Sequence, residues 1–136
     1  MGWIPVALAM MLFACGNDGR ERVMATYDNG QPSVVRYFDH DGQCVREVQY
    51  YEDGIVKMEG GIKDNLRDGE WKAYFPDGRL QSEGLFSNNL RTGKAVVYYE
   101  NGNRYMEGYY KEGRHCGHWI YYDEQGYVLR EVDYGD

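Results

Sequence analysis

The sequence predicts an all-β protein: a single antiparallel meander of repeated β-hairpins with a period of 24 residues, behind an N-terminal signal segment. Clusters of turn-forming residues recur at this spacing, and each carries a glycine at the same phase. These glycines are Gly54, Gly78, Gly102 and Gly126. No stretch shows a sustained 3.6-residue apolar period, so almost no helix is expected outside the signal. Self-similarity at a fixed period indicates an array in which each unit contacts only its neighbours.

The clearest copy of the unit runs from residue 69 to residue 93. A run carrying Trp71 and Tyr74 leads into the turn Pro76-Asp77-Gly78, and a second run follows it. This pattern predicts a β-hairpin, because proline presets φ and glycine accepts a positive φ. Three more positions keep the period: Glu59, Glu83, Glu107 and Glu131; Gly69, Gly93 and Gly117; Tyr50, Tyr74, Tyr98 and Tyr122. Sequential strands joined by short connections pair antiparallel.

Two kinds of connection are expected to alternate along the array. Hairpin turns are predicted at residues 52–54, 76–78, 100–102 and 124–126, and longer loops at 64–69, 88–93 and 111–117. Upstream, the spacing between turn signals is shorter: Asn29-Gly30, Asp41-Gly42 and Asp53-Gly54 lie 12 residues apart. The first strands should therefore be joined by tight turns at both ends, as befits an atypical terminal repeat.

The N-terminus has a different character from the array. Residues 1–14 carry no charged side chain, and their apolar run of roughly 11 residues is shorter than the ~20 that span a bilayer. A run of this length is typical of a signal-peptide core. Residues 15–22 are small, polar and charged, which predicts a flexible tether. The repeat domain is expected over residues 23–136.

The end of the signal segment, Leu12-Phe13-Ala14-Cys15-Gly16, resembles a bacterial lipoprotein lipobox. The resemblance implies cleavage before Cys15 and a diacylglycerol on its sulfur. It also implies a cell-envelope location, lipid-anchored to a bacterial membrane on the periplasmic side or at the cell surface. An ordinary secretory signal is the alternative.

The composition excludes some partners. The formal net charge is −7, which argues against nucleic acid, whose phosphates need Lys and Arg, and against docking on anionic lipid. Membrane contact is then expected only through the anchor at Cys15. The chain has 14 Tyr against 4 Phe and 3 Trp. Tyrosine suits a sheet that buries the ring on one side while the hydroxyl at its end contacts water.

The repeat unit itself resembles a known family. The pattern Gly-x-Trp-x-x-Tyr-Phe-x-x-Gly-x-x-x-x-Glu-Gly, present at residues 69–84, resembles MORN repeats, and more narrowly the bacterial MORN-variant family. Some members of that family are described as antitoxins of toxin–antitoxin pairs. The resemblance covers roughly residues 27–134 and implies a scaffold or contact surface. This copy departs from the pattern at Ala95, where an aromatic is usual, and at Val132, where a glycine is usual.

Candidate chemistry is sparse. His115-Cys116-Gly117-His118 is the most metal-like cluster, but zinc needs four converging ligands, so a polar loop is expected. The repeated glutamates should lie ~10 Å apart in alike environments, which suits structural positions better than an acid–base pair. Arg67 and Arg91, with His115, form a column that indicates a solvated face, or alternatively an anion-binding edge. We expect no catalytic residue, no metal and no cofactor.

Structural roles are expected for the repeated aromatic residues and for the two cysteines of the array. The stripe of Trp71, Tyr74, Tyr98, Trp119 and Tyr122 is expected to fill the grooves between strands. Cys44 and Cys116 are three periods apart, or about 30 Å along the sheet, so they should not form a disulfide.

The remaining tyrosines exceed what one buried face needs and predict a partner surface. They are Tyr105, Tyr109, Tyr110 and Tyr127. The predicted function is a non-enzymatic cell-envelope lipoprotein whose repeat sheet acts as a protein-interaction or scaffold module, with glycan as another possible ligand. The alternative is an antitoxin-like inhibitor that binds and occludes a toxin, although an export signal does not suit a cytosolic target.

Overall fold

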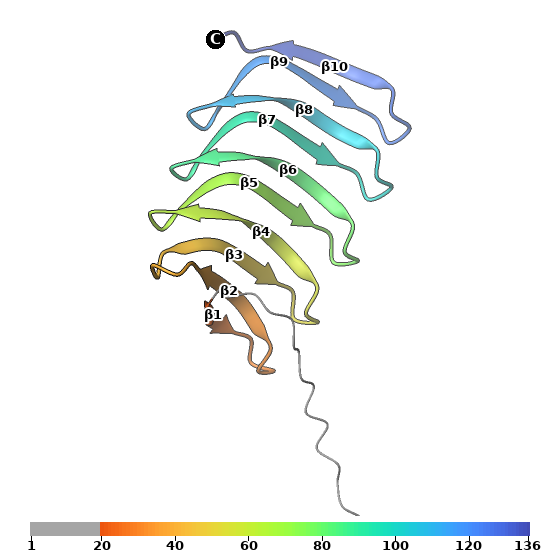
Figure 1. The fold of residues 1–136 in the computed structure, drawn as a ribbon. Coiled ribbons are helices and arrows are strands. Elements are labelled where there is room, and N and C mark those ends of the chain that lie inside the picture. The colour runs from red at the N-terminus through yellow and green to blue at the C-terminus, as the bar shows by residue number, and fades with distance from the viewer. Residues whose placement is uncertain (1–19) are drawn as a thin grey trace, which may run out of the picture.

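The computed structural model describes residues 20–136, which form one antiparallel sheet of ten strands in chain order (Figure 1). The strands are β1 Arg20–Thr26, β2 Pro32–Phe38, β3 Cys44–Tyr50, β4 Val56–Lys63, β5 Leu66–Tyr74, β6 Leu80–Ser87, β7 Leu90–Tyr98, β8 Arg104–Lys111, β9 Arg114–Tyr122 and β10 Val128–Asp133. The described residues contain no helix. The predicted all-β meander of hairpins is confirmed.

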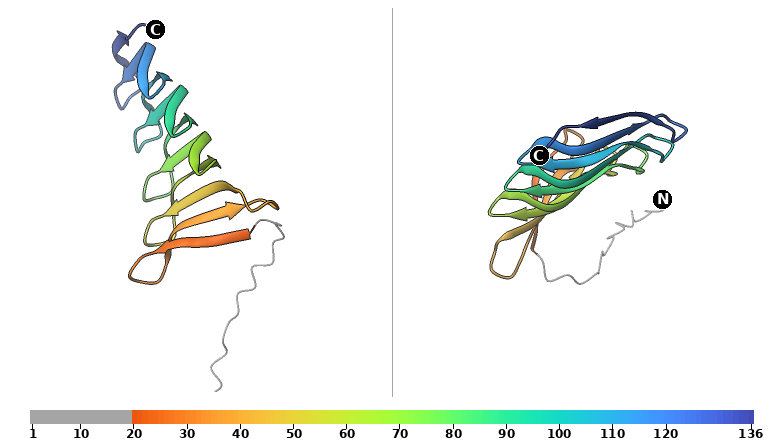
Figure 2. Two further views of the ribbon diagram at one scale, coloured as in Figure 1. Left: turned by 90° about the vertical axis from the view of Figure 1, so that its left-hand side faces the viewer. Right: turned by 90° about the horizontal axis from the view of Figure 1, so that it is seen from above.

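The sheet is a single layer, twisted along its length, with β1 and β10 at opposite ends (Figure 2). Each strand pairs with the one before and the one after it in sequence, as expected of a repeat array. The core is correspondingly thin. One buried cluster is built from Cys44, Ile62 and Trp71, with Phe38, Met58 and Phe86 packed against it.

The predicted hairpin turns form along one edge of the sheet. At the turn after β5, the amide of Gly78 donates to the Phe75 carbonyl at 2.8 Å, and the amide of Phe75 donates to the Arg79 carbonyl at 2.8 Å. Gly78 has a φ of +89°, which only glycine adopts without strain. Asp77 Oδ1 accepts from the Arg79 amide at 2.9 Å, so the aspartate closes the turn from its side chain.

The connections at the other edge are shorter than the sequence predicted. Instead of a loop over residues 64–69, a two-residue turn at Asp64 and Asn65 joins β4 to β5, with φ values of +50° and +61°. Two successive left-handed residues match the twist of a hairpin, so the strands can continue to the turn. Gly69 then lies inside β5 with a φ of +81°, where the pairing register shifts between Gly60 and Ile62. The repeat glycine therefore forms a β-bulge.

Strand β1 begins at Arg20, so it includes the last three residues of the segment 15–22 that the sequence analysis assigned to a tether. All seven residues of β1 are exposed. The predicted signal segment 1–14 and the lipidation site Cys15 lie outside the described residues. Cys44 in β3 and Cys116 in β9 are free cysteines on strands separated by five others, in agreement with the expectation that they do not pair.

Candidate interaction surface

One side of the sheet, the tryptophan face, carries Trp71 and Trp119. Because side chains alternate between faces along a strand, the paired row Gly60, Trp71, Gly84, Ala95 and Gly108 also lies on this side. The Trp71 indole covers Gly60, and its Nε1 donates to the Gly61 carbonyl at 2.9 Å. Trp119 covers Gly108 in the same way and is only 1% exposed. Glycine here provides the space that an indole fills.

The two departures from the repeat pattern have clear structural reasons. Between the indoles, the pair Gly84 and Ala95 has no ring above it, and the Arg91 side chain takes that place. A Cβ atom at Gly84 would lie 3.4 Å from Arg91 Nη1. Val132 pairs with Trp119, whose ring lies over Gly108 instead, so no indole requires a glycine at position 132.

A line of alternating aromatic and cationic side chains crosses the tryptophan face, and we call it the arginine–aromatic column. Arg67 Cζ lies 4.3 Å from the Trp71 ring centroid and 5.6 Å from that of Phe86. Arg91 Cζ lies 5.1 Å from the Phe86 centroid and 5.5 Å from that of Tyr110. Both arginines are half-buried, so the solvated column expected from sequence is wrong. Stacking on rings is favourable for guanidinium, which is weakly hydrated above and below its plane.

His115 continues the column and separates the predicted metal-like cluster. Its ring stacks on Trp119 with centroids 4.0 Å apart, and it meets Tyr110 and Tyr134 edge to face, each at 5.0 Å. His118 lies on the opposite face, where Nε2 is 2.8 Å from Glu131 Oε2. Within residues 20–136, no group of three or more His, Cys, Asp or Glu side chains is placed to hold a metal ion.

The other side of the sheet, the glutamate face, carries the repeated glutamates. The first three accept a hydrogen bond from the tyrosine fifteen residues later: Tyr74 Oη to Glu59 Oε1 at 2.8 Å, Tyr98 Oη to Glu83 Oε1 at 2.8 Å, and Tyr122 Oη to Glu107 Oε1 at 3.0 Å. The predicted stripe thus divides, with tryptophans on one face and tyrosines on the other. These three glutamates are structural acceptors that link adjacent strands.

Charge pairing sets the protonation of the first of these glutamates. Burial acts to raise the pKa of Glu59, but hydrogen bonds from Arg46 and Tyr74 outweigh it, and the net pKa lies below its ordinary value. Burial, followed by the hydrogen bond to Glu59, raises the pKa of Tyr74 to about 12. The carboxylate therefore stays ionised and the phenol stays protonated at neutral pH.

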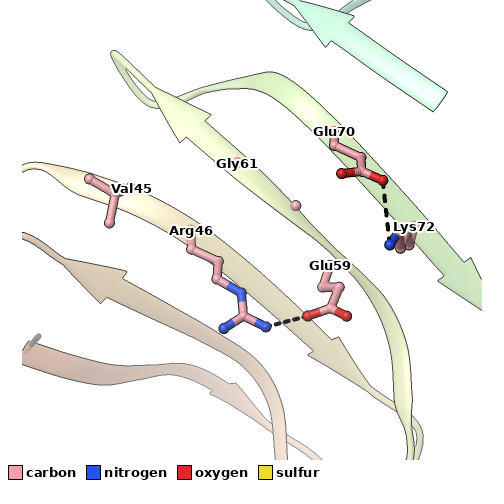
Figure 3. A pocket seen from close by; sticks show the side chains of 7 residues that line it. Val45, Arg46, Glu59, Gly61, Glu70 and Lys72 are labelled. Carbon is pink, nitrogen blue, oxygen red and sulfur yellow. Dashed lines mark hydrogen bonds and ion pairs between the residues drawn. The ribbon is translucent and has the colours of Figure 1, made fainter. Parts of the chain in front are cut away.

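A shallow groove on the glutamate face, between β3 and β5, shows how the charges are matched (Figure 3). Arg46 bonds to Glu59, and Lys72 Nζ lies 3.4 Å from Glu70 Oε1. Val45, Gly60 and Gly61 complete the lining. Two carboxylates and two cations thus pair off, and neither carboxylate lies in the apolar, unpaired setting that would raise its pKa for acid catalysis.

The four tyrosines predicted to bind a partner occupy different places. Tyr109, 50% exposed, lies on the glutamate face opposite Lys94, whereas Tyr110 points to the tryptophan face and is half-buried in the arginine–aromatic column. Tyr105, 40% exposed, packs edge to face on Tyr99. Tyr127, 73% exposed, follows the turn that joins β9 to β10. The structure therefore does not bring the four together into one surface.

Sequence reasoning missed an exposed leucine beside Tyr109. Leu85 is 41% exposed and lines a groove on the glutamate face together with Lys94. Leu85, Lys94 and Tyr109 stand on the adjacent strands β6, β7 and β8, and we call them the Leu85–Tyr109 patch. Leu85 precedes Tyr109 by one period, so the repeat alignment contained the signal that could have found it.

The architecture is that of a repeat protein with two distinct, uncovered faces. The sequence model of the family described as MORN repeat variant matches residues 67–88 and 91–112, which hold β5–β6 and β7–β8. Two consecutive hairpins of the sheet are thus repeats of this variant type. No protein with a curated description matches the sequence.

A solved structure resembles the chain at low identity. It is the Glycosylation Associate Protein (Gap123) complex from Streptococcus agalactiae, with 19% identity and a TM-score of 0.49. The match covers 81% of this chain and 20% of that one, so the chain spans about a fifth of the length of its structural neighbour. Within residues 20–136 there is no helix long and apolar enough to cross a membrane.

Proposed function

We propose that this protein is a non-enzymatic interaction module that binds another protein through its repeat sheet. The observation that supports this most is the Leu85–Tyr109 patch, an exposed leucine and an exposed tyrosine on either side of Lys94. An exposed tyrosine is typical of the centre of a protein interface, and charged side chains such as Lys94 are typical of its rim. Glycan is the other ligand class that such a tyrosine suits.

The absence of enzymatic activity remains part of the proposal. The carboxylates of the glutamate face repeat in similar hydrogen-bonded environments, whereas acid–base catalysis needs neighbouring groups whose environments separate their pKa values. A rigid sheet whose charged groups are already paired supports recognition better than proton transfer.

The location is proposed from the sequence. Residues 1–14 would act as a lipoprotein signal, and Cys15 would carry the lipid that anchors the protein in the cell envelope. A Cys15→Ser variant should move from the membrane fraction to the soluble fraction of the cell. Retention in the membrane fraction without Cys15 would refute the lipid anchor.

Binding can be tested by crosslinking the full chain in its own cells and identifying captured proteins by mass spectrometry. Leu85→Ala and Tyr109→Ala should each reduce capture of the partner. Leu129→Ala is a matched control, because Leu129 is 66% exposed and lies on the last strand, away from the patch. Equal capture by all three variants would show that the patch is not the binding surface. Capture of a cytosolic toxic enzyme would support the antitoxin-like inhibitor instead.

A further inference from the structure

The arginine–aromatic column places two guanidinium groups over aromatic rings. Arg67 Cζ lies over the rings of Trp71 and Phe86, and Arg91 Cζ over those of Phe86 and Tyr110. A guanidinium donates its N–H groups in its own plane, so contact with a ring through its face uses none of its donors. The rings also fix the orientation of the two side chains, which lowers the entropy cost of binding.

Neither guanidinium has an acidic partner in the part of the chain that the structure describes. Within residues 20–136, no salt bridge or hydrogen bond involves the guanidinium of Arg67 or Arg91, whereas Arg46 and Arg104 on the glutamate face both pair with glutamates. Glu47 is close enough for Arg67 to lower its pKa, but Glu47 is already bonded to Arg36 and Gln49 at 2.8 and 3.0 Å.

The unpaired charges are unexpected in this protein. The chain carries a net charge of −7, with more than enough carboxylates to neutralise two arginines. The carboxylates nevertheless gather on the glutamate face, and the pair Gly84 and Ala95 leaves room for Arg91 to lie across the tryptophan face. Half-buried guanidinium donors that pair with no carboxylate of the chain remain available to a carboxylate of another molecule.

We propose that Arg67 and Arg91 bind carboxylates of an acidic, extended segment of the partner protein. This inference rests on the proposed function and names the chemistry of the partner. The two arginines stand on β5 and β7, two strands apart, which is about 10 Å. In an extended segment of polyproline II conformation, which has three residues per turn, carboxylates three residues apart lie on the same side and are separated by about 9 Å. Each guanidinium then receives one carboxylate in a bidentate pair.

Other anions match the site less well. Nucleic acid places a charge every ~3.4 Å along a strand, and the net charge of −7 repels a long polyanion. A short peptide segment with two or three carboxylates interacts chiefly with the local charge of the column, since more distant charges are screened by salt. Phe86 and Tyr110 offer apolar contact to the segment between its carboxylates.

The test is a fluorescence anisotropy titration of the full chain, purified in mild detergent. The probe is a labelled 12-residue peptide of repeating Glu-Gly-Ser, and its Gln-Gly-Ser counterpart is the control peptide. The wild-type chain should bind the acidic probe, and binding should weaken as salt rises. Arg67→Gln and Arg91→Gln should each weaken it at least about tenfold, the loss expected for one charged hydrogen-bonded pair.

Three controls decide the outcome. Lys72→Gln removes the same charge from the glutamate face, outside the Leu85–Tyr109 patch, and should leave binding unchanged. Arg91→Lys keeps the charge but lacks the planar fork, so its affinity should fall between those of wild type and Arg91→Gln. Circular dichroism melting curves establish that each variant is folded at the assay temperature.

The inference is overturned if the wild-type chain does not bind the acidic probe, if Lys72→Gln weakens binding as much as Arg91→Gln, or if a single-stranded oligonucleotide binds more tightly with the same arginine dependence. The same variants in the cellular crosslinking experiment separate the two proposals. Capture that is lost in Leu85→Ala but unchanged in Arg91→Gln would retain the proposed function and remove this site from it.

Discussion

The glycines beneath the indoles give the sharpest stability prediction, because the repeat provides its own control. Gly60, Gly84 and Gly108 are equivalent positions, and none has a positive φ, so alanine introduces no backbone strain at any of them. A Cβ atom at Gly108 would lie 2.2 Å from the Trp119 ring, and one at Gly60 would lie 2.3 Å from Trp71. At Gly84 the nearest atom is the Ala95 Cβ, at 3.3 Å.

These distances determine the expected magnitudes. Contact at 2.2 Å requires the Trp119 indole to leave its place, and this indole is the most buried large side chain in the described sheet. Overpacking costs about 1–3 kcal/mol, and losing a buried tryptophan altogether costs about 3–5 kcal/mol. Gly108→Ala should therefore destabilise by about 2–5 kcal/mol. Gly84→Ala should stay within about 1 kcal/mol of wild type, because Arg91 can shift and alanine restricts the unfolded chain.

Urea denaturation followed by far-ultraviolet circular dichroism measures the difference, and tryptophan emission reports whether an indole has become exposed. The double variant Gly108→Ala/Trp119→Ala should be less destabilised than the two single effects together, since the second change removes the clash that the first creates. Equal destabilisation by Gly108→Ala and Gly84→Ala, or strict additivity in the double variant, would refute the account of glycine as space for the indole.

Three further measurements test the charges and thiols. Tyr74→Phe should cost about 1 kcal/mol, since it removes the hydrogen bond to Glu59. The folded-state pKa of Glu59 is lowered, so its stabilisation is present above pH 4.5 and is lost as pH falls through that lowered value; acid titration of Tyr74→Phe should show a smaller loss. The pKa of Tyr74 is raised from 10.0 to about 12, so the protein should lose stability as pH rises between these values and the phenol ionises on unfolding. Tyrosinate absorbance that titrates fully near pH 10 would contradict this expectation. A thiol reagent at pH 8 should label half-exposed Cys116 quickly and Cys44 only on unfolding, because burial raises the Cys44 thiol pKa; equal rates would contradict this.

Much of the fold could be predicted because each signal in the repeat has a local cause. The turn at Pro76-Asp77-Gly78 needs only the residues that form it, and the 24-residue spacing then fixes the number and order of strands from residue 44 onward. The second kind of connection was predicted too long. Asp64-Asn65 was treated as part of a polar loop, although two residues that accept positive φ values suffice for a hairpin.

The surroundings of the arginines were harder to predict than the face they occupy. Arg67 lies four residues before Trp71, and the bulge at Gly69 sets these four residues of β5 opposite two of β4, so Arg67 keeps the face that alternation from Trp71 predicts. The column was taken to be solvated because alternation along one strand does not show that rings of the neighbouring strands lie against its side chains. Another set of residues at the 24-residue period would have identified the column. Phe86 and Tyr110 keep this period, and they pair directly with Arg91 and His115.

Strands that contact only their sequence neighbours make the length of this molecule a direct count of its units. Each hairpin lengthens the sheet by two strands, or about 10 Å. Its strands pair only with each other and with those of the adjoining hairpins. Gain or loss of a whole unit would move the two ends apart or together by that step while the chemistry of every other unit stayed the same. The length of the sheet can therefore change in steps of 24 residues, by duplication or deletion of the corresponding segment of the gene.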